Sequence, residues 1–345
     1  MKFVERLIAY NWQKELIIIG FMIIYVILHY VGVGFNKSKI SYWIKSHREV
    51  LGNQFYQVGP VPNKDGQKEQ DLVVSDSPTI YTTYATGRVN VKSLTGRFEL
   101  LGRQNFITLA MEYLFDFFST GKTPSDKIDI VIAPSDPSAI EGFVFAVVNK
   151  SNMRAAREDN YFLSLTKTTD SAKLPPQFTF MSESAEITDI LYSKELADAV
   201  EGSEGVLQYM SITDLPGPAP TRLDDLKSSP KVVLSLNFPS NDTQAAASAK
   251  IVNAAINLVD VLVAKKPWRL EVSKKTRATR EAEVKKALKN LDIQKQEQLA
   301  MKKAELKREQ EANLAKLSPA EQRKAEQKER DKDLRRQRSK QTKKG

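Results

Sequence analysis

Two kinds of apolar pattern divide this chain, and the first is an unbroken run near its start. The run LIIIGFMIIYVILHYVGVGF extends over residues 16–35 and carries no formal charge. A helix of that length is about 30 Å long, which matches the hydrocarbon thickness of a bilayer. Because the run is apolar all round, it lacks the polar face that a surface helix of a soluble core turns outward. We therefore predict one transmembrane helix at residues 16–35.

The flanks of this run bear on its processing and its orientation. A cleaved signal peptide is the alternative, but the apolar part of such a peptide is only about 7 to 15 residues long. Three cations lie in the 15 residues before the run and four in the 15 after it, a slight bias that predicts a luminal segment 1–15 and a cytosolic remainder. The sequons at Asn36, Asn149 and Asn241 are then expected to stay unmodified. His29 has no ionisable partner within the run, and we interpret it as a neutral hydrogen-bonding group.

The second pattern occupies residues 36–266, where shorter apolar stretches have either strand or helix spacing. Residues 38–58 predict an amphipathic helix, whose apolar stripe includes Ile40, Trp43, Ile44, Val50, Leu51 and Phe55. Strand-like runs lie at residues 97–101, 128–133, 143–148, 161–166, 207–212 and 232–238. Helical patterns lie at residues 105–118, 184–200 and 243–264. This irregular alternation predicts an α+β cytosolic domain with helices on one face of a mixed sheet.

A charged helical tail follows over residues 267–345. Between Trp268 and Ser318 the chain has no glycine or proline and consists mostly of good helix formers. A helix of about 50 residues would extend about 75 Å. Its apolar seam is sparse and is interrupted by Lys295 and Lys302, which favours a lone charged helix or a weak coiled coil. Ser318 followed by Pro319 predicts that a second helix starts there.

Charge is concentrated in this tail. From residue 265 onward the chain has 27 Lys and Arg against 13 Asp and Glu, a net charge of +14, whereas the preceding 264 residues carry 25 against 29. A basic tail on a mildly acidic body predicts a polyanionic partner, either RNA or anionic lipid. No aromatic residue follows Trp268, so contact with phosphate is expected and base stacking is not. The candidate contact residues are Lys274, Lys275, Arg277, Arg280, Arg335, Arg336, Arg338, Lys340, Lys343 and Lys344.

The residues give no support for an enzyme. The absence of cysteine excludes disulfides, thiol nucleophiles and cysteine metal sites. Gly121–Thr123 resembles the end of a phosphate-binding loop, but Asp116 stands where that motif needs a glycine. His47 is the single histidine outside the apolar run, and we expect it at the surface of the first helix. The adjacent Asp224 and Asp225 lack calcium-loop spacing and are expected to be solvated. We therefore predict a non-enzymatic binding protein with no catalytic, cofactor or metal site.

Several stretches between Ile40 and Lys344 carry a resemblance to a known family. They are WIKSHREVLGNQFYQVG, YATGRV, RFELLGRQNF, FVFAVVNK, VVLSLNFP and KKPWRL, with the charged terminal helix after them. In these stretches and in their order the chain resembles the calumin family of endoplasmic reticulum membrane proteins, the coiled-coil-domain subunit of the PAT complex. None of the stretches is a catalytic signature.

The resemblance implies a single-pass protein of the endoplasmic reticulum with its cytosolic domain against the Sec translocon and its basic helices on ribosomal RNA. Such proteins assist the insertion and folding of nascent multipass membrane proteins beside a small membrane partner, Asterix. Animal members have a long acidic luminal region linked to calcium, whereas 15 residues precede the apolar run here. Two alternatives stay open: a membrane scaffold whose tail binds anionic lipid, and a protein of calcium homeostasis. RNA competition against liposome flotation distinguishes the scaffold.

Overall fold

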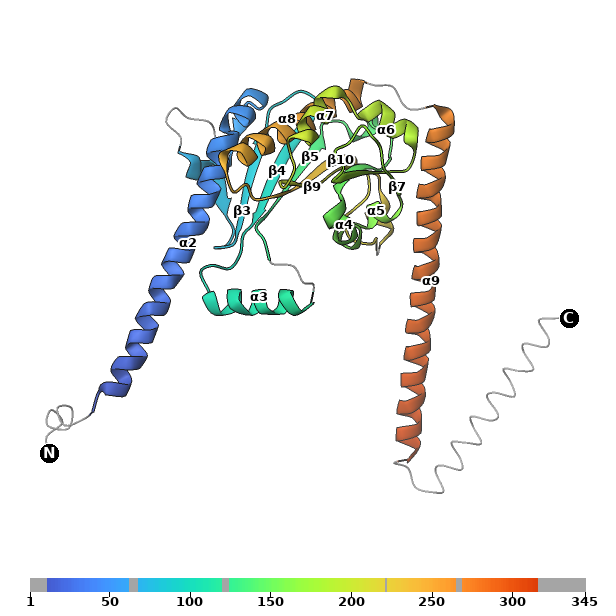
Figure 1. Ribbon diagram of the computed structural model, residues 1–345. Helices are drawn as coiled ribbons and strands as arrows, with labels where there is room; N and C mark the ends of the chain where they lie inside the picture. Colours follow the sequence, from blue (N-terminus) through green and yellow to red (C-terminus); the bar gives the residue numbers. More distant parts are fainter. Residues whose placement is uncertain (1–10, 62–67, 120–123, 221, 265–268, 316–345) are drawn as a thin grey trace. The chain divides into compact units, whose positions relative to one another are not determined.

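The computed structural model describes residues 11–61, 68–119, 124–220, 222–264 and 269–315. The chain forms two compact units, residues 1–281 and residues 282–345. The first unit is built on one large β-sheet with helices packed on it (Figure 1).

The sheet has ten strands in the order β1-β3-β4-β5-β10-β9-β6-β8-β7, with β2 paired to β3. The strands are β1 (Gln57–Val58), β2 (Val73–Ser75), β3 (Ile80–Thr86), β4 (Val91–Glu99), β5 (Lys127–Pro134), β6 (Phe145–Asn149), β7 (Lys167–Thr169), β8 (Phe178–Ser182), β9 (Leu207–Thr213) and β10 (Lys231–Asn237). Every pair among these strands is antiparallel. The predicted α+β class is confirmed, and the predicted mixed sheet is wrong.

The helical connection between β8 and β9 explains this difference. Two helices carry the chain from β8 to β9, a connection that would permit parallel neighbours. In the sheet, however, β6 lies between β8 and β9 and runs antiparallel to both. The sequence pattern indicates the helical stretch of this connection, but it shows neither β8 nor which strand lies between β8 and β9.

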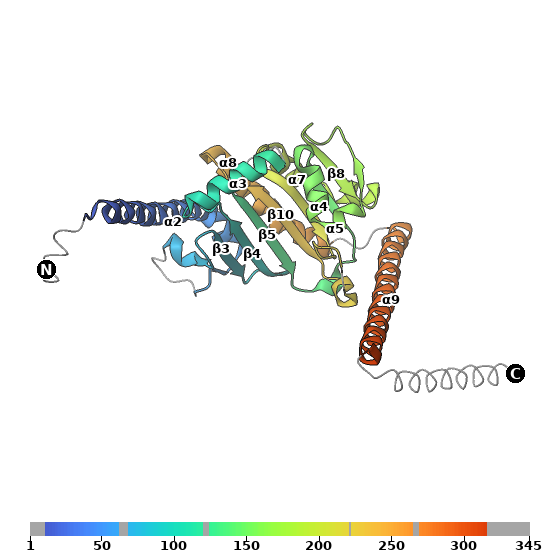
Figure 2. The same ribbon diagram turned by 90° about the horizontal axis from the view of Figure 1, so that it is seen from below.

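The helices cover the two faces of the sheet unequally (Figures 1 and 2). They are α2 (Gln13–Gln54), α3 (Phe106–Ser119), α4 (Met153–Asp159), α5 (Tyr161–Ser164), α6 (Ala185–Leu191), α7 (Lys194–Glu201), α8 (Asp242–Ala264) and α9 (Leu270–Ala315), with 3-10 turns at Glu69–Leu72, Pro137–Ala139, Lys150–Asn152 and Leu223–Leu226. The main core joins the sheet to α8, α6, α7 and the second half of α2. A smaller core on the opposite face joins β6 and β8 to α4 and α5.

Most of the predicted elements are present. The strands expected at residues 128–133, 207–212 and 232–238 are β5, β9 and β10, and the helices expected at residues 105–118 and 243–264 are α3 and α8. β5 and β10 have an apolar alternation that buries one side of the strand in the main core, as β5 does with Ile128, Ile130 and Ile132. In β9 a bulge interrupts the alternation.

Other predictions are wrong for local reasons. Residues 161–166 were expected as a strand, but Tyr161–Ser164 is a short helix that buries the adjacent residues Phe162 and Leu163 on one side. The helix predicted over residues 184–200 is two helices, because Ser193 accepts a hydrogen bond from the Leu196 N–H at 3.4 Å and caps a new start. β8 was not predicted, because all five of its residues are buried and it has no alternation.

The second unit contains the rest of α9, of which residues 282–315 are described. Val284 and Leu291 of this part are half-buried. Five other large apolar side chains are exposed, namely Leu288, Ile293, Leu299, Met301 and Leu306. The predicted long charged helix is therefore present, and its coiled-coil pairing stays a prediction. The restart expected at Ser318 lies outside the described residues.

Candidate membrane and polyanion interfaces

Helix α2 has two halves with opposite environments. Its large apolar residues from Leu16 to Phe35 are exposed, whereas Ile40, Trp43 and Ile44 are at most 4% exposed in the main core. Among the described residues, α2 and α8 are long and apolar enough to cross a membrane. The most apolar window of α8 is 61% buried, as in a core helix, and that of α2 is 6% buried. The exposed half of α2 therefore has the length and surface of a membrane span.

The two halves form one unbroken helix, although the sequence suggested an anchor and a separate amphipathic helix. The turn between them is held by Asn36, whose Nδ2 donates to the carbonyl oxygens of Pro78 at 3.0 Å and Leu101 at 3.2 Å. Its Oδ1 accepts from the Arg103 guanidinium at 3.0 Å. Asn36 is fully buried. The sequon at this position thus has a structural role at the end of the apolar segment.

The loop that contains Leu101 and Arg103 also packs closely against α2 at Gly32, one helical turn before Asn36. A Cβ atom at Gly32 would lie 2.2 Å from the backbone oxygen of Arg103, so only glycine fits there. The Arg103 guanidinium also lies over the Phe35 ring, 5.2 Å from its centroid. The loop before α3 is therefore attached to α2 from Gly32 to Asn36.

A buried carboxylate completes this junction. Asp126 has a side chain only 4% exposed and accepts two hydrogen bonds from Arg103 at 2.8 Å, one from Lys39 at 2.5 Å and one from the Leu101 N–H at 2.8 Å. Burial by itself raises the pKa of Asp126, but the hydrogen bonds from Arg103, Lys39 and Leu101 outweigh it and hold this pKa below the ordinary value. An ionised Asp126 thus joins α2, the loop before α3 and the start of β5.

His47 is buried in the second half of α2, and the expectation that it lies at the surface is wrong. Its ring stacks on Trp43 with centroids 3.8 Å apart. Nδ1 lies 2.9 Å from the Trp43 carbonyl oxygen, which can only accept, so this nitrogen carries the proton. Nε2 then accepts from the Ser248 hydroxyl of α8 at 2.9 Å. Desolvation lowers the pKa of His47 to about 4, against the weaker opposing effect of the hydrogen bond to the Trp43 carbonyl oxygen.

The neutral His47 makes stability depend on pH. In the unfolded chain a histidine titrates near 6.5, so between pH 6.5 and 4 the unfolded state binds more protons and stability falls on acidification. We expect the free energy of unfolding to decrease by about 3 kcal/mol over this range. Denaturant unfolding at several pH values should show this slope, and a His47→Leu/Ser248→Ala variant should lack that contribution. An unchanged pH profile in the double variant would contradict the assignment.

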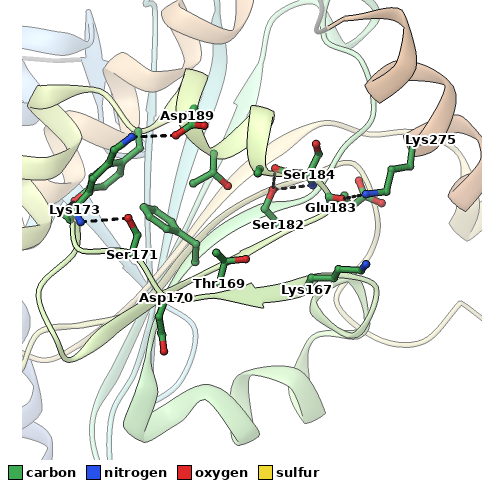
Figure 3. Close-up of a pocket in the computed structure, with 14 residues that line it drawn as sticks. Lys167, Thr169, Asp170, Ser171, Lys173, Ser182, Glu183, Ser184, Asp189 and Lys275 are labelled. Carbon is green, nitrogen blue, oxygen red and sulfur yellow. Dashed lines mark hydrogen bonds and ion pairs between the residues drawn. The ribbon is translucent and has the colours of Figure 1, made fainter.

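The root of α9, residues 270–281, contains four of the predicted polyanion contacts in different environments. Lys274 is exposed. Lys275 donates to the Glu183 carbonyl oxygen at 2.6 Å and lines a pocket beside β8 (Figure 3). Arg277 is 72% exposed and pairs with Glu141 at 3.1 Å. The root therefore combines free positive charge with attachment to the body.

Arg280 is the attachment point. Its guanidinium forms paired hydrogen bonds with both Glu183 (2.6 and 3.2 Å) and Asp214 (2.7 and 3.0 Å), and these two carboxylates are 3% and 2% exposed. A Cβ atom at Gly142 would lie 2.3 Å from an Asp214 carboxylate oxygen, so the absence of a side chain there makes room for the pair. Val272 of the same root belongs to the main core. Arg280 thus attaches the root of α9 to the body.

Some of the other candidate residues lie within the described residues, and the rest lie outside them. At the turn Leu223–Leu226, Asp224 is exposed and pairs with Lys227, as expected for a solvated residue. Asp225 is half-buried and accepts from the Arg222 N–H at 2.9 Å. Gly121–Thr123 and six predicted cations lie outside the described residues: Arg335, Arg336, Arg338, Lys340, Lys343 and Lys344. Within the described residues no group of three or more His, Asp or Glu side chains could hold a metal ion.

The fold and these interfaces define a class, namely an α+β domain carried on an apolar helix of membrane-spanning length and continued by a basic helix. Residues 11–336 match the family described as PAT complex subunit CCDC47, and the chain belongs to this family. The resemblance found in the sequence is thereby confirmed.

Individual relatives support this membership. The chain is 28% identical over 338 residues to a UPF0674 endoplasmic reticulum membrane protein of Schizosaccharomyces pombe, which covers 94% of this chain and 86% of that protein. A second protein of this description, from Saccharomyces cerevisiae, is 29% identical over 74% of this chain and 67% of its own length. The human PAT complex subunit CCDC47 is 23% identical over 80% of this chain and 57% of its own length.

Proposed function

We propose that this chain is a non-enzymatic biogenesis factor of the endoplasmic reticulum membrane, spanning it once with residues 16–35. The observation that carries the proposal is the change within α2 from an exposed apolar half to a half buried in the domain. Relatives named endoplasmic reticulum membrane proteins support the location. In this proposal the N-terminus is luminal and the domain is cytosolic, which the slight excess of cations after the span supports.

The proposed partners follow from the family and from the charge of the tail. Membership of the PAT complex subunit family supports assembly with a small membrane protein such as Asterix, beside the Sec translocon. In this role the chain assists the insertion and folding of nascent multipass membrane proteins. The basic tail is proposed to bind ribosomal RNA through phosphate contacts.

The environments of the basic residues indicate which of them are available to contact phosphate. We assign phosphate contact to the exposed Lys274 and Arg277 and to the six distal cations of residues 335–344. Arg280 is occupied by two carboxylates and Lys275 by a backbone carbonyl, so these two residues attach the root of α9 to the body instead.

Replacing the six distal cations with glutamine should reduce co-sedimentation of the full chain with ribosomes at low salt by about tenfold or more, because each lost phosphate contact weakens salt-sensitive binding. The variant leaves the root of α9 and the body unchanged. The measurement compares both chains across a salt titration, in which the variant should have the shallower dependence.

A matched control replaces six acidic residues of the tail, Glu297, Glu305, Glu309, Glu311, Glu321 and Glu326, with glutamine, which should strengthen the association. Undiminished co-sedimentation of the distal variant would contradict ribosome binding by the tail. If that variant instead loses binding to anionic liposomes, the tail is a lipid-binding element.

A further inference from the structure

Helix α3 has an apolar surface without a partner among the described residues. It lies in a loop between two neighbouring strands, β4 and β5, and none of its residues is buried. Eight of its fourteen residues are large, apolar and 42% to 78% exposed: Phe106, Ile107, Met111, Tyr113, Leu114, Phe115, Phe117 and Phe118. Contiguous apolar surface of this kind marks a site that another phase or molecule covers.

The polar residues of α3 form one narrow stripe. Thr108, Glu112, Asp116 and Ser119 follow each other at spacings of four, four and three, and therefore lie on one side of the helix. Thr108 and Glu112 line a cleft together with Glu99 and Lys127 at the ends of β4 and β5. The polar stripe thus faces the domain, and the apolar surface faces away from it.

The position of α3 relative to α2 identifies what covers this surface. The chain leading into α3 packs on Gly32 and bonds to Asn36 through Arg103, and the chain leaving it bonds to Lys39 through Asp126. These three α2 residues lie within about one helical turn of Phe35, where the apolar segment ends. Both ends of the α3 loop are therefore held at the level where a span meets the membrane surface. Figure 1 shows α3 on the side of the sheet toward which the apolar half of α2 extends, running crosswise to that helix.

We propose that α3 is an in-plane membrane helix whose apolar side inserts into the cytosolic interface of the bilayer. This inference rests on the proposed span at residues 16–35, which fixes the level of the interface. A narrow polar stripe on a crosswise apolar helix is the pattern of an interfacial helix. Because α3 carries two acidic residues and no Lys or Arg, apolar burial drives its insertion, and neutral lipid suffices.

The natural absence of cysteine permits a direct test with the full-length chain. Single cysteines at Leu114, Phe118, Thr108, Ile23 and Val89 are labelled with an environment-sensitive fluorophore, and each protein is reconstituted alone in phosphatidylcholine vesicles. Quenching is measured with aqueous iodide and with lipids that carry a nitroxide near the headgroup or deep in the acyl chain. Val89, 80% exposed on the body, is the control for an apolar residue in water.

Labels at Leu114 and Phe118 should lose most of their fluorescence to the shallow nitroxide, and labels at Thr108 and Val89 should respond to iodide. Iodide quenching at Leu114 and Phe118 overturns the proposal, and so does protection from both quenchers, which a second copy of the chain would produce. Ile23 reports separately on the span. Deep quenching at Ile23 together with iodide quenching at the two α3 labels would contradict the interfacial helix and would still support the transmembrane span.

Discussion

Replacing Arg280 with methionine is expected to lower the free energy of unfolding by about 3–5 kcal/mol, because it leaves two buried carboxylates without their cation. Glu183 and Asp214 are almost fully buried and accept four hydrogen bonds from this one side chain. Methionine fills much of the same volume, so the effect reports charge more than lost packing. Chemical denaturation of the full chain in detergent measures it, and protease sensitivity of residues 270–281 shows whether the root of α9 detaches first.

Two control variants separate the buried pair from ordinary surface charge. Arg280→Met combined with Glu183→Gln and Asp214→Asn removes all three charges and should recover most of the lost stability. Arg269→Met breaks an exposed contact between the residue just before this root and Glu186 of α6, and should cost at most about 0.5 kcal/mol. Equal effects of Arg280→Met and Arg269→Met would contradict a buried attachment point.

Replacing Asp126 with asparagine should destabilise the junction of α2 and the α3 loop by about 3 kcal/mol, because Arg103 and Lys39 lose the charge that both contact. The side chain keeps its size, so the change is electrostatic. Denaturation midpoints measure the loss, and a faster hydrogen exchange of residues 101–106 would show that the loop leaves α2.

The comparison for Asp126 is Asp136→Asn. Asp136 is an exposed cap that accepts from the Ser138 N–H at 2.9 Å, and its loss should lower the denaturation midpoint only slightly. A midpoint for Asp126→Asn no lower than that for Asp136→Asn would show that the junction does not depend on the buried carboxylate.

The helical spacing of His47 indicated burial, although the polarity of histidine favoured the surface. His47 follows Trp43 by four residues and precedes Leu51 by four, so it occupies the spacing of the predicted apolar stripe. Its residue type favours the surface, but Ser248 supplies the hydrogen bond that permits burial. For His47, the position in the helical pattern predicted burial correctly, whereas the residue type did not.

Other features depend on contacts between distant residues and could not be read from local pattern. Arg280 belongs to a basic cluster by composition, and its partners Glu183 and Asp214 stand 97 and 66 residues before it. Helix α3 was predicted over nearly the observed residues, yet amphipathic spacing indicates only that a helix covers an apolar surface. Which surface it covers depends on the attachment of its loop to Gly32 and Asn36.

The continuity of α2 fixes the angular relation between the proposed span, residues 16–35, and the domain. Successive residues of a helix are rotated by about 100°, and the chain from Gln13 to Gln54 is helical throughout. The side of the span that faces any neighbouring helix is therefore set by the number of residues between it and the buried positions at Ile40 and Trp43. One residue added or removed between them would turn the span by about 100° against the domain. The number of residues between the span and the buried positions thus determines the rotation of the span about its own axis. The span can therefore present one particular face to neighbouring membrane helices.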